Sequence, residues 1–339
     1  MRGLREAALL GAGLAAIGVL AWTFGTDDLA AAFRRVSPGY LCVYVALATA
    51  AVVGHSLRWR LVARALGANP PLARLVQARL AGDAVGLIVP SAKMAGEPVR
   101  FVLAYSHCGD GPRTGAGVTI DRIIEAMGSL LCTVAYVAVF AHAQSAQSQP
   151  DSTQVLIIAA LVLLVAVAIL LELLRRGVRP LAPLYGPSAR RRFPQLAGWM
   201  DGLRGTEDHL VRFFRDHKAA FLRGLLASLL IEGLAIVEYQ FLLNTFAIQL
   251  DLPTLLMALV TSGLVRVAPT PAGLGALEAG QVALLEVTTG QGEIGFVVGI
   301  VMRLHETLLT VVGLAVLSLS GVSLGRARRL MRSAARPAG

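Results

Sequence analysis

The chain of 339 residues is 55% hydrophobic and 15% charged, whereas about 25% of the residues in an average soluble domain are charged. This composition excludes an ordinary soluble domain and indicates an integral membrane protein. The net charge of +10 would suggest nucleic-acid binding in a soluble protein, but here the arginines lie beside apolar runs, as the positive-inside rule describes. We therefore expect no nucleic-acid partner.

Six apolar runs are long enough to cross a bilayer, which takes about 20 helical residues. They cover residues 7–24, 40–57, 117–141, 154–173, 219–246 and 294–321. Because these runs do not alternate like strands, helices are favoured over a β-barrel. Residues 1–24 are alternatively a cleaved signal peptide, although the run is long for one and no clear small-x-small site precedes Thr26.

Two shorter apolar segments, 72–89 and 253–268, end just before prolines. Proline removes a backbone donor and disfavours helix at the residue before it, while glycine permits a turn. We therefore expect two broken hairpins, 72–112 and 253–292. The expected break positions are Pro90, Gly96, Pro269, Pro271, Gly273 and Gly275.

The distribution of Lys and Arg predicts that both termini and the segment 174–218 are cytoplasmic. That segment carries ten Lys or Arg residues, whereas 142–153 and 247–252 carry none. Arg34 and Arg35 fall on the side predicted to be external. Within the segment, 177–195 is rich in Pro, Gly and Arg and predicts a loop, and 196–214 predicts an interfacial amphipathic helix. This helix either attracts anionic lipid or positions the next span.

An internal repeat with an offset of 181 residues runs through the chain. Eight identities fall between 90–125 and 271–306, where this composition gives about three by chance. Among them are the residues that are energetically unfavourable in a membrane helix, which pair as Pro90/Pro271, Glu97/Glu278, Arg122/Arg303 and Glu125/Glu306. Since three full spans reverse the direction of the chain, the second copy should be inverted. We predict an all-α polytopic bundle of two inverted repeats, 1–145 and 146–325, each with three spans and one broken re-entrant hairpin, followed by a basic tail, 326–339.

Charged residues in these apolar runs are the candidate functional site, because a charge at the bilayer centre costs about 3 kcal/mol and must be paired. Arg122/Glu125 and Arg303/Glu306 are three apart and should touch, which leaves Glu97 and Glu278 to find partners across the interface between the halves. The candidate substrate-binding residues are Arg122, Arg303, Glu97, Glu278, Lys93 and Arg100, and the supporting residues are Glu125, Glu306, His305 and Asp121.

Two interpretations of these charges stay open. In one they form a structural salt-bridge cluster, and the carboxylates of Glu97 and Glu278 settle against the positive ends of helices. In the other, helix N-termini and arginines receive a lipid phosphate, and the glutamates contact an amine or a proton. Arg58 and Glu172 are expected to extend to the interface.

Signatures of an enzyme are absent from the sequence. There is no Walker loop, HExxH or GxSxG motif, and the three cysteines lack metal-ligand spacing. We therefore expect no enzymatic activity, no cofactor and no metal.

The sequence resembles the flippase-like membrane family named after the membrane region of lysylphosphatidylglycerol synthase. The resemblance rests on "PSAKMAGEPVR" (90–100), "RIIE" (122–125) and "PTPAGLGALE" (269–278). The first motif often has Gly-Gly-Glu where this chain has Ala95-Gly96-Glu97, and the last often has Gly-Gly in place of Ala272-Gly273. The resemblance implies movement of lipids between leaflets. Because the chain ends just after its last span, we do not expect the synthase activity.

We thus expect a flippase in the inner, cytoplasmic membrane that moves a phospholipid or another polar envelope lipid, such as a glycolipid, through a charged midplane cavity. The alternatives are a scaffold that recruits an envelope-lipid biosynthetic enzyme through 174–218, and an intramembrane lipid-modifying enzyme.

Overall fold

The computed structural model describes residues 33–89, 94–108, 110–144, 151–267 and 275–320, and all regular structure within them is helical. Four helices are long and apolar enough to cross a membrane: Pro38–Ala65 (α3), the Gly111–Ala143 part of Gly111–Gln144 (α6), Lys218–Asn244 (α11) and Gly292–Leu319 (α14). They correspond to four of the six predicted runs, two of which extend up to two residues past the helix end. The run 154–173 lies in a 25-residue helix, Asp151–Arg175 (α7), and the run 7–24 lies outside the described residues.

Both predicted hairpins have two helical arms. The first consists of Leu72–Ile88 (α4), a short 3-10 turn at Met94–Gly96 (η1) and Glu97–Cys108 (α5). The second consists of Leu252–Val267 (α12) and Ala276–Thr289 (α13). Gly275 precedes α13 with φ 77°, a conformation that favours glycine because it has no Cβ. Pro90, Pro269, Pro271 and Gly273 lie outside the described residues.

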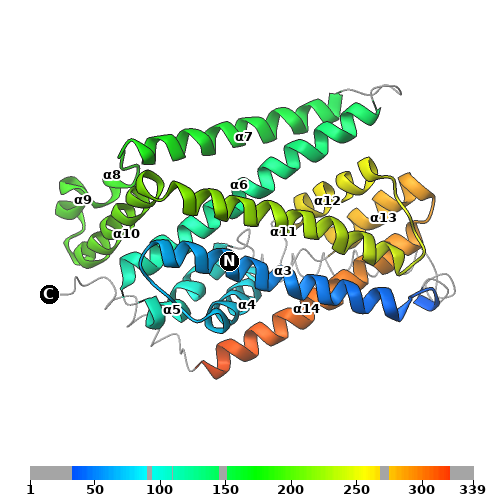
Figure 1. Cartoon of the computed structure of the whole chain (residues 1–339), viewed down its shortest axis with the longest axis horizontal. Coiled ribbons are helices and arrows are strands. Elements are labelled where there is room, and N and C mark those ends of the chain that lie inside the picture. The colour runs from blue at the N-terminus through cyan, green and yellow to red at the C-terminus, as the bar shows by residue number, and fades with distance from the viewer. Residues whose placement is uncertain (1–32, 90–93, 109, 145–150, 268–274, 321–339) are drawn as a thin grey trace.

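The helix boundaries follow the offset of 181 residues. Moving the starts of α3, α4, α5 and α6 by that offset gives positions within two residues of the starts of α11, α12, α13 and α14. The equivalent helices α3 and α11 pack antiparallel against each other (Figure 1). The Ser37 N–H donates to the Thr245 carbonyl at 3.0 Å, and further along α3 the Arg58 guanidinium reaches Ser228.

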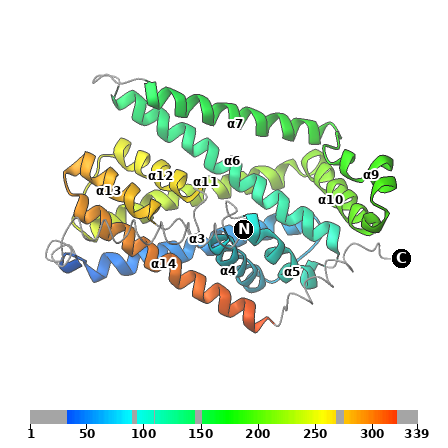
Figure 2. The ribbon, with the colours of Figure 1, turned by 180° about the vertical axis from the view of Figure 1, so that it is seen from behind.

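Cross-contacts between the two groups of helices are reciprocal. Helix α4 packs on α14, and its equivalent α12 packs on α6, so each first hairpin arm meets the last long helix of the other group (Figure 2). A Cβ on Gly313 of α14 would lie 2.2 Å from the Leu80 carbonyl oxygen of α4.

The basic segment after α7 folds onto the bundle. It contains Ala182–Tyr185 (α8), Pro187–Arg192 (α9), a 3-10 turn at Pro194–Leu196 (η2) and Ala197–Asp216 (α10). The prediction of a loop over 177–195 was therefore only partly right: 177–181 has turns and irregular structure, but 182–185 and 187–192 are helical. Pro183 and Pro187 stand at the first or second position of these helices, where no N–H is required. Helix α10 is amphipathic as predicted, and its apolar face, which includes Leu210, Phe213 and Phe214, packs on α6 and α7. This packing favours the positioning role over lipid attraction.

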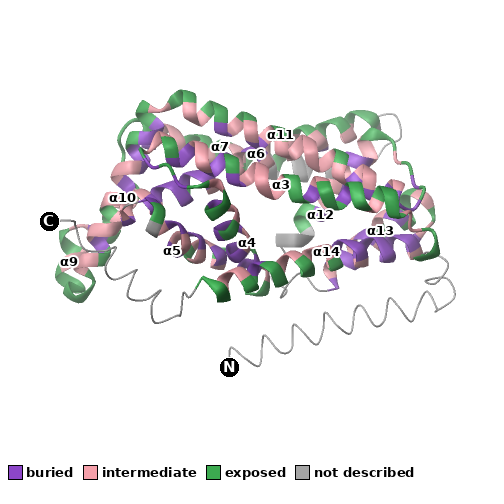
Figure 3. Cartoon of the chain, turned by 60° about the horizontal axis from the view of Figure 1, so that its bottom comes forward, coloured by how far each residue is buried: buried purple, intermediate pink, exposed green. Residues whose placement is uncertain are grey.

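Two of the buried apolar clusters include hairpin residues, a third lies between α3, α6, α7 and α10, and the outer faces are apolar. Figure 3 shows buried residues along α4 and α13, with exposed residues on the outer faces. The exposed residues include Val162 of α7, Leu230 of α11 and Leu308 of α14, each more than half exposed. An exposed apolar surface of this extent suits contact with lipid.

Candidate functional site

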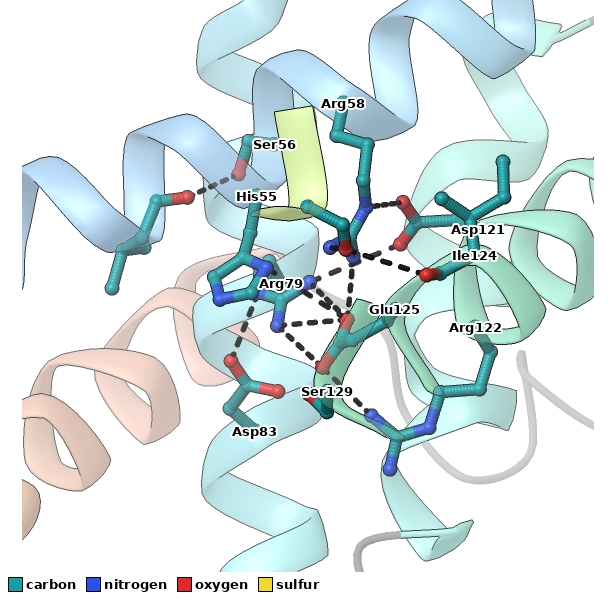
Figure 4. Close-up of polar contacts among 12 residues, drawn as sticks. His55, Ser56, Arg58, Arg79, Asp83, Asp121, Arg122, Ile124, Glu125 and Ser129 are labelled. Atoms are coloured by element: carbon teal, nitrogen blue, oxygen red, sulfur yellow. Dashed lines mark hydrogen bonds and ion pairs between the residues drawn. The ribbon is translucent and has the colours of Figure 1, made fainter. Parts of the chain in front are cut away.

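Arg58 of α3 lies at the centre of a buried ionic network. Its side chain is fully buried and donates from Nε to Asp121 Oδ1 at 2.9 Å, from Nη2 to Glu125 Oε2 at 2.6 Å and from Nη1 to Ser228 Oγ at 2.9 Å (Figure 4). The expectation that Arg58 extends to the interface was wrong. Three partners on α6 and α11 hold the guanidinium inside the bundle and compensate its burial.

Arg100 of α5 belongs to the same network. The guanidinium donates from Nη2 to Asp121 Oδ2 at 2.6 Å and from Nη1 to Glu97 Oε2 at 3.1 Å, and it stacks 4.4 Å above the ring of Trp59. Asp121 is itself fully buried and bridges Arg58 and Arg100. A lipid phosphate would have to displace these contacts to reach Arg100, so the geometry fits a structural arginine.

Arg79 of α4 is a network residue that the sequence analysis did not select. Its Nη1 lies 3.2 Å from Glu125 Oε2, and its Nε lies 3.3 Å from Asp83 Oδ2. Figure 4 shows Arg58 and Arg79 pointing toward Glu125 from two different helices. The sequence feature that could have indicated Arg79 is an arginine in an apolar hairpin arm with an aspartate four residues later.

Arg122 of α6 is the most exposed arginine of this network, with 28% of its side chain accessible. Its Nη1 lies 3.1 Å from Glu125 Oε1, and its Nε lies 3.7 Å from Glu97 Oε1. The predicted contact between Arg122 and Glu125 is therefore present. His55 of α3 also approaches Glu125, with 3.9 Å between Nδ1 and Oε2.

The second half contains an equivalent cluster. Glu278 is fully buried near the start of α13, where it accepts a bond from the Gly275 N–H at 3.0 Å and from Arg303 Nε at 2.9 Å. Arg303 Nη1 lies 3.5 Å from Glu306 Oε2. The triad Glu278–Arg303–Glu306 thus repeats the triad Glu97–Arg122–Glu125. Both glutamates at the hairpins lie in the first turn of the second arm, as predicted.

The expectation that Glu97 and Glu278 pair across the interface between the halves was wrong. Glu97 contacts Arg100 and Arg122, and Glu278 contacts Arg303, all within the same half. Helices α6 and α14 each pack beside their own hairpin, which brings their central arginines within reach of the nearer carboxylate.

Two further predicted residues are His305 and Lys93. The His305 ring packs edge-on against Tyr44 at 5.4 Å, and Lys93 lies outside the described residues. Within the described ranges no group of three or more His, Cys, Asp or Glu side chains has the arrangement of a metal site.

Comparison with known proteins identifies the family. The family model described as "Lysylphosphatidylglycerol synthase TM region" matches residues 8–331, almost the whole chain. The chain belongs to this family. It is also similar to a UPF0104 membrane protein of Methanothermobacter thermautotrophicus, with 22% identity over 280 residues, which cover 81% of this chain and 83% of that protein.

This family member contains a second polar cluster that the sequence analysis missed. In the second half, Tyr239 of α11 donates its hydroxyl to Gln281 of α13, and Gln281 Nε2 donates to Ser262 Oγ of α12 at 2.9 Å. All three side chains are buried. By the offset of 181, Tyr239 and Gln281 stand where Arg58 and Arg100 stand in the first half. Neutral residues are inconspicuous in a sequence, so only their proximity revealed this cluster.

Proposed function

We propose that the chain moves a polar lipid between the two leaflets of a membrane and that its two halves are inverted repeats. The antiparallel packing of α3 on α11 and the reciprocal contacts of α4 with α14 and α12 with α6 support the inversion. Interrupted helices in inverted repeats are typical of substrate sites near the midplane of transporters. The proposed limits of the repeats remain 1–145 and 146–325, with hairpins that enter from opposite faces.

The observation that carries the proposal is the pair of equivalent triads. Each holds an arginine of a long apolar helix against the carboxylate that begins a broken hairpin's second arm. Intramembrane charges at such positions commonly mark a substrate path. Because Arg58, Arg79 and Arg100 are buried and bonded, Arg122 and Arg303, with 28% and 13% of their side chains exposed, are the arginines we assign to a lipid phosphate.

We place the protein in the inner, cytoplasmic membrane with both termini in the cytoplasm. The arginine-rich segment that forms α8 to α10 supports this orientation. The cargo is a phospholipid or another polar envelope lipid, and the proposal requires no enzymatic step and no cofactor.

A reconstitution experiment tests this function. The purified protein is inserted into vesicles that carry labelled phospholipid or glycolipid, and the fraction of label reached by a membrane-impermeant quencher is followed with time. We expect Arg122→Gln and Arg303→Gln to slow movement about tenfold or more, since a lost charge-assisted contact is worth at least about 1.4 kcal/mol.

Controls separate function from folding. The double variant Glu278→Gln/Arg303→Gln removes both charges of the buried pair, so that neither is left unpaired. Arg64→Gln removes an arginine whose side chain donates a hydrogen bond to Asn69, outside the ionic network, and should move lipid normally. Normal movement by folded Arg303→Gln would refute its role, and no movement of any lipid by the wild-type protein would refute transport.

A scaffold remains the second candidate, and the surface of α9 and η2 favours it. Arg191, Arg192 and Phe193 are exposed there on a segment that packs against the bundle through α10. Since deletion of 174–218 would remove the packed face of α10, the sharper test is Arg191→Glu/Arg192→Glu. A scaffold predicts that this variant loses a co-purifying lipid-biosynthetic enzyme, whereas a flippase predicts unchanged lipid movement.

A further inference from the structure

Polar side chains continue from the ionic network into the interface between α6 and α11. The Ser129 hydroxyl of α6 donates to the Glu232 carboxylate of α11. Both side chains are partly buried, and both lie near the middle of long apolar helices. Among the described residues Glu232 has this hydroxyl partner and no ion pair. A carboxyl group at this depth is unfavourable in lipid, so protein or water must surround it.

The position of this pair follows the helical repeat. Ser129 lies one turn beyond Glu125 on α6, and Glu232 lies one turn beyond Ser228 on α11. Glu125 and Ser228 both contact Arg58. Figure 4 shows Ser129 next to Glu125, on the side away from Asp121. The pair therefore continues the network along one line.

The line extends further along α6. Cys132 and Tyr136 follow Ser129 on α6, and both side chains are partly buried. Glu125, Ser129, Cys132 and Tyr136 follow one another at intervals of three or four residues, which places them on one helix face. We call these four residues, together with Ser228 and Glu232, the polar track.

The crossing of the two helices gives the track its place. A Cβ on Gly128 would lie 2.6 Å from Ser228 Cβ, so the backbones of α6 and α11 approach closely there. Beyond this point the helices diverge toward Gln144 and Asn244 (Figures 1 and 2), and α12 packs on both of them. The track thus runs from the network of the first half toward the first arm of the second hairpin.

We propose that the polar track binds the polar headgroup of the cargo as it passes between the ionic network and the far end of α6. This inference rests on the proposed function and deepens it. It places the headgroup path along the interface of α6 and α11, with Ser129 and Glu232 as hydrogen-bonding groups in the path.

Thiol labelling tests whether the track is open to water and polar groups. In a Cys42→Ser/Cys108→Ala variant, Cys132 remains as the thiol on the track. The matched control carries Ala135→Cys in a chain with Cys42, Cys108 and Cys132 replaced. Ala135 lies three residues from Cys132 on α6 and is exposed on the surface of this spanning helix, where lipid surrounds it. A charged methanethiosulfonate should modify Cys132 about tenfold faster, because only a hydrated thiol ionises and reacts. Equal or slower modification of Cys132 would overturn the inference.

Transport by matched variants tests the role of the side chains. Ser129→Ala and Glu232→Ala should slow lipid movement at least about fivefold, the effect of one lost hydrogen bond. Thr310→Ala should not, because Thr310 is the repeat equivalent of Ser129 and its hydroxyl bonds the Glu306 carbonyl of its own helix. If the protein moves lipid but Cys132 does not react, the polar track is refuted as the headgroup path and the proposed function stands. A reactive Cys132 without movement of any lipid refutes the proposed function and leaves a hydrated path.

Discussion

The two halves share a framework but differ in the side chains around it. Both have a long helix, a broken hairpin and a second long helix at equivalent positions, and both have a triad of one arginine between two glutamates. Around the first triad lie Arg58, Arg79, Arg100 and Asp121. In the second half, the described residues at the positions equivalent to Arg58 and Arg100 are the neutral Tyr239 and Gln281, and Gln281 also bonds Ser262.

This difference shows which features the repeat requires. A carboxylate at the start of the second arm and an arginine on the next long helix occur in both halves, so they belong to the hairpin itself. Among the described side chains, the additional charges of the first half tie α3, α4, α5 and α6 together and reach α11. Desolvation offsets much of the attraction within a buried ion pair, so we take the effect of these pairs to be on the geometry of the helices rather than on net stability. We infer that the first hairpin is the more firmly positioned of the two.

The largest expected effect is at Asp121. The change Asp121→Asn leaves the guanidinium groups of Arg58 and Arg100 without their shared carboxylate and should cost about 3–5 kcal/mol of unfolding free energy. The equivalent change in the second half, Met302→Leu, conserves volume and should cost less than about 1.5 kcal/mol. Unfolding in mixed detergent micelles measures both. Similar losses at the two positions would contradict the asymmetry.

A smaller effect is expected at the glutamates, and here the variant of the second half should lose more stability than its equivalent in the first half. Glu278 is fully buried and accepts bonds from Arg303 and the Gly275 N–H, so Glu278→Gln should cost about 1.5–3 kcal/mol. Glu97 has 17% of its side chain exposed, so Glu97→Gln should cost less. Unfolding in mixed detergent micelles measures both losses. A greater loss of unfolding free energy for Glu97→Gln would show that the second cluster contributes less to stability than the first.

The smallest expected difference is between two equivalent glycines. A Cβ on Gly82 would lie 2.5 Å from Arg100 Cγ and 3.0 Å from the Gly96 carbonyl oxygen, so Gly82→Ala should cost about 1–3 kcal/mol. Gly263 has no described heavy atom within 4 Å of an added Cβ, and Gly263→Ala should stabilise α12 by up to about 1 kcal/mol. Melting temperatures of the two variants provide the comparison. Equal shifts would mean that the two hairpins are packed equally tightly.

Much of the candidate site was predictable because a charge in an apolar run is conspicuous. Glu97, Arg122, Glu278 and Arg303 were selected for this reason, and the spacing of three residues predicted the contacts of Arg122 with Glu125 and of Arg303 with Glu306. Arg58 and Arg79 were misjudged or missed, since an arginine near a helix end or in a short segment usually extends to the interface. Their burial follows from the approach of α3 and α4 to α6, which a single helix does not reveal.

The sequence by itself determined the long helices that the structure describes, the two arms of each hairpin and the offset between the halves, because hydrophobic run length, proline and glycine act locally on the chain. Only the tertiary structure decided the partners of the charges. It directed Glu97 and Glu278 to arginines of their own half and gave Arg58 three partners on two helices. It also joined Ser129 to Glu232 across 103 residues of sequence. Such contacts depend on which helices cross and at which residue, and therefore on packing between distant segments.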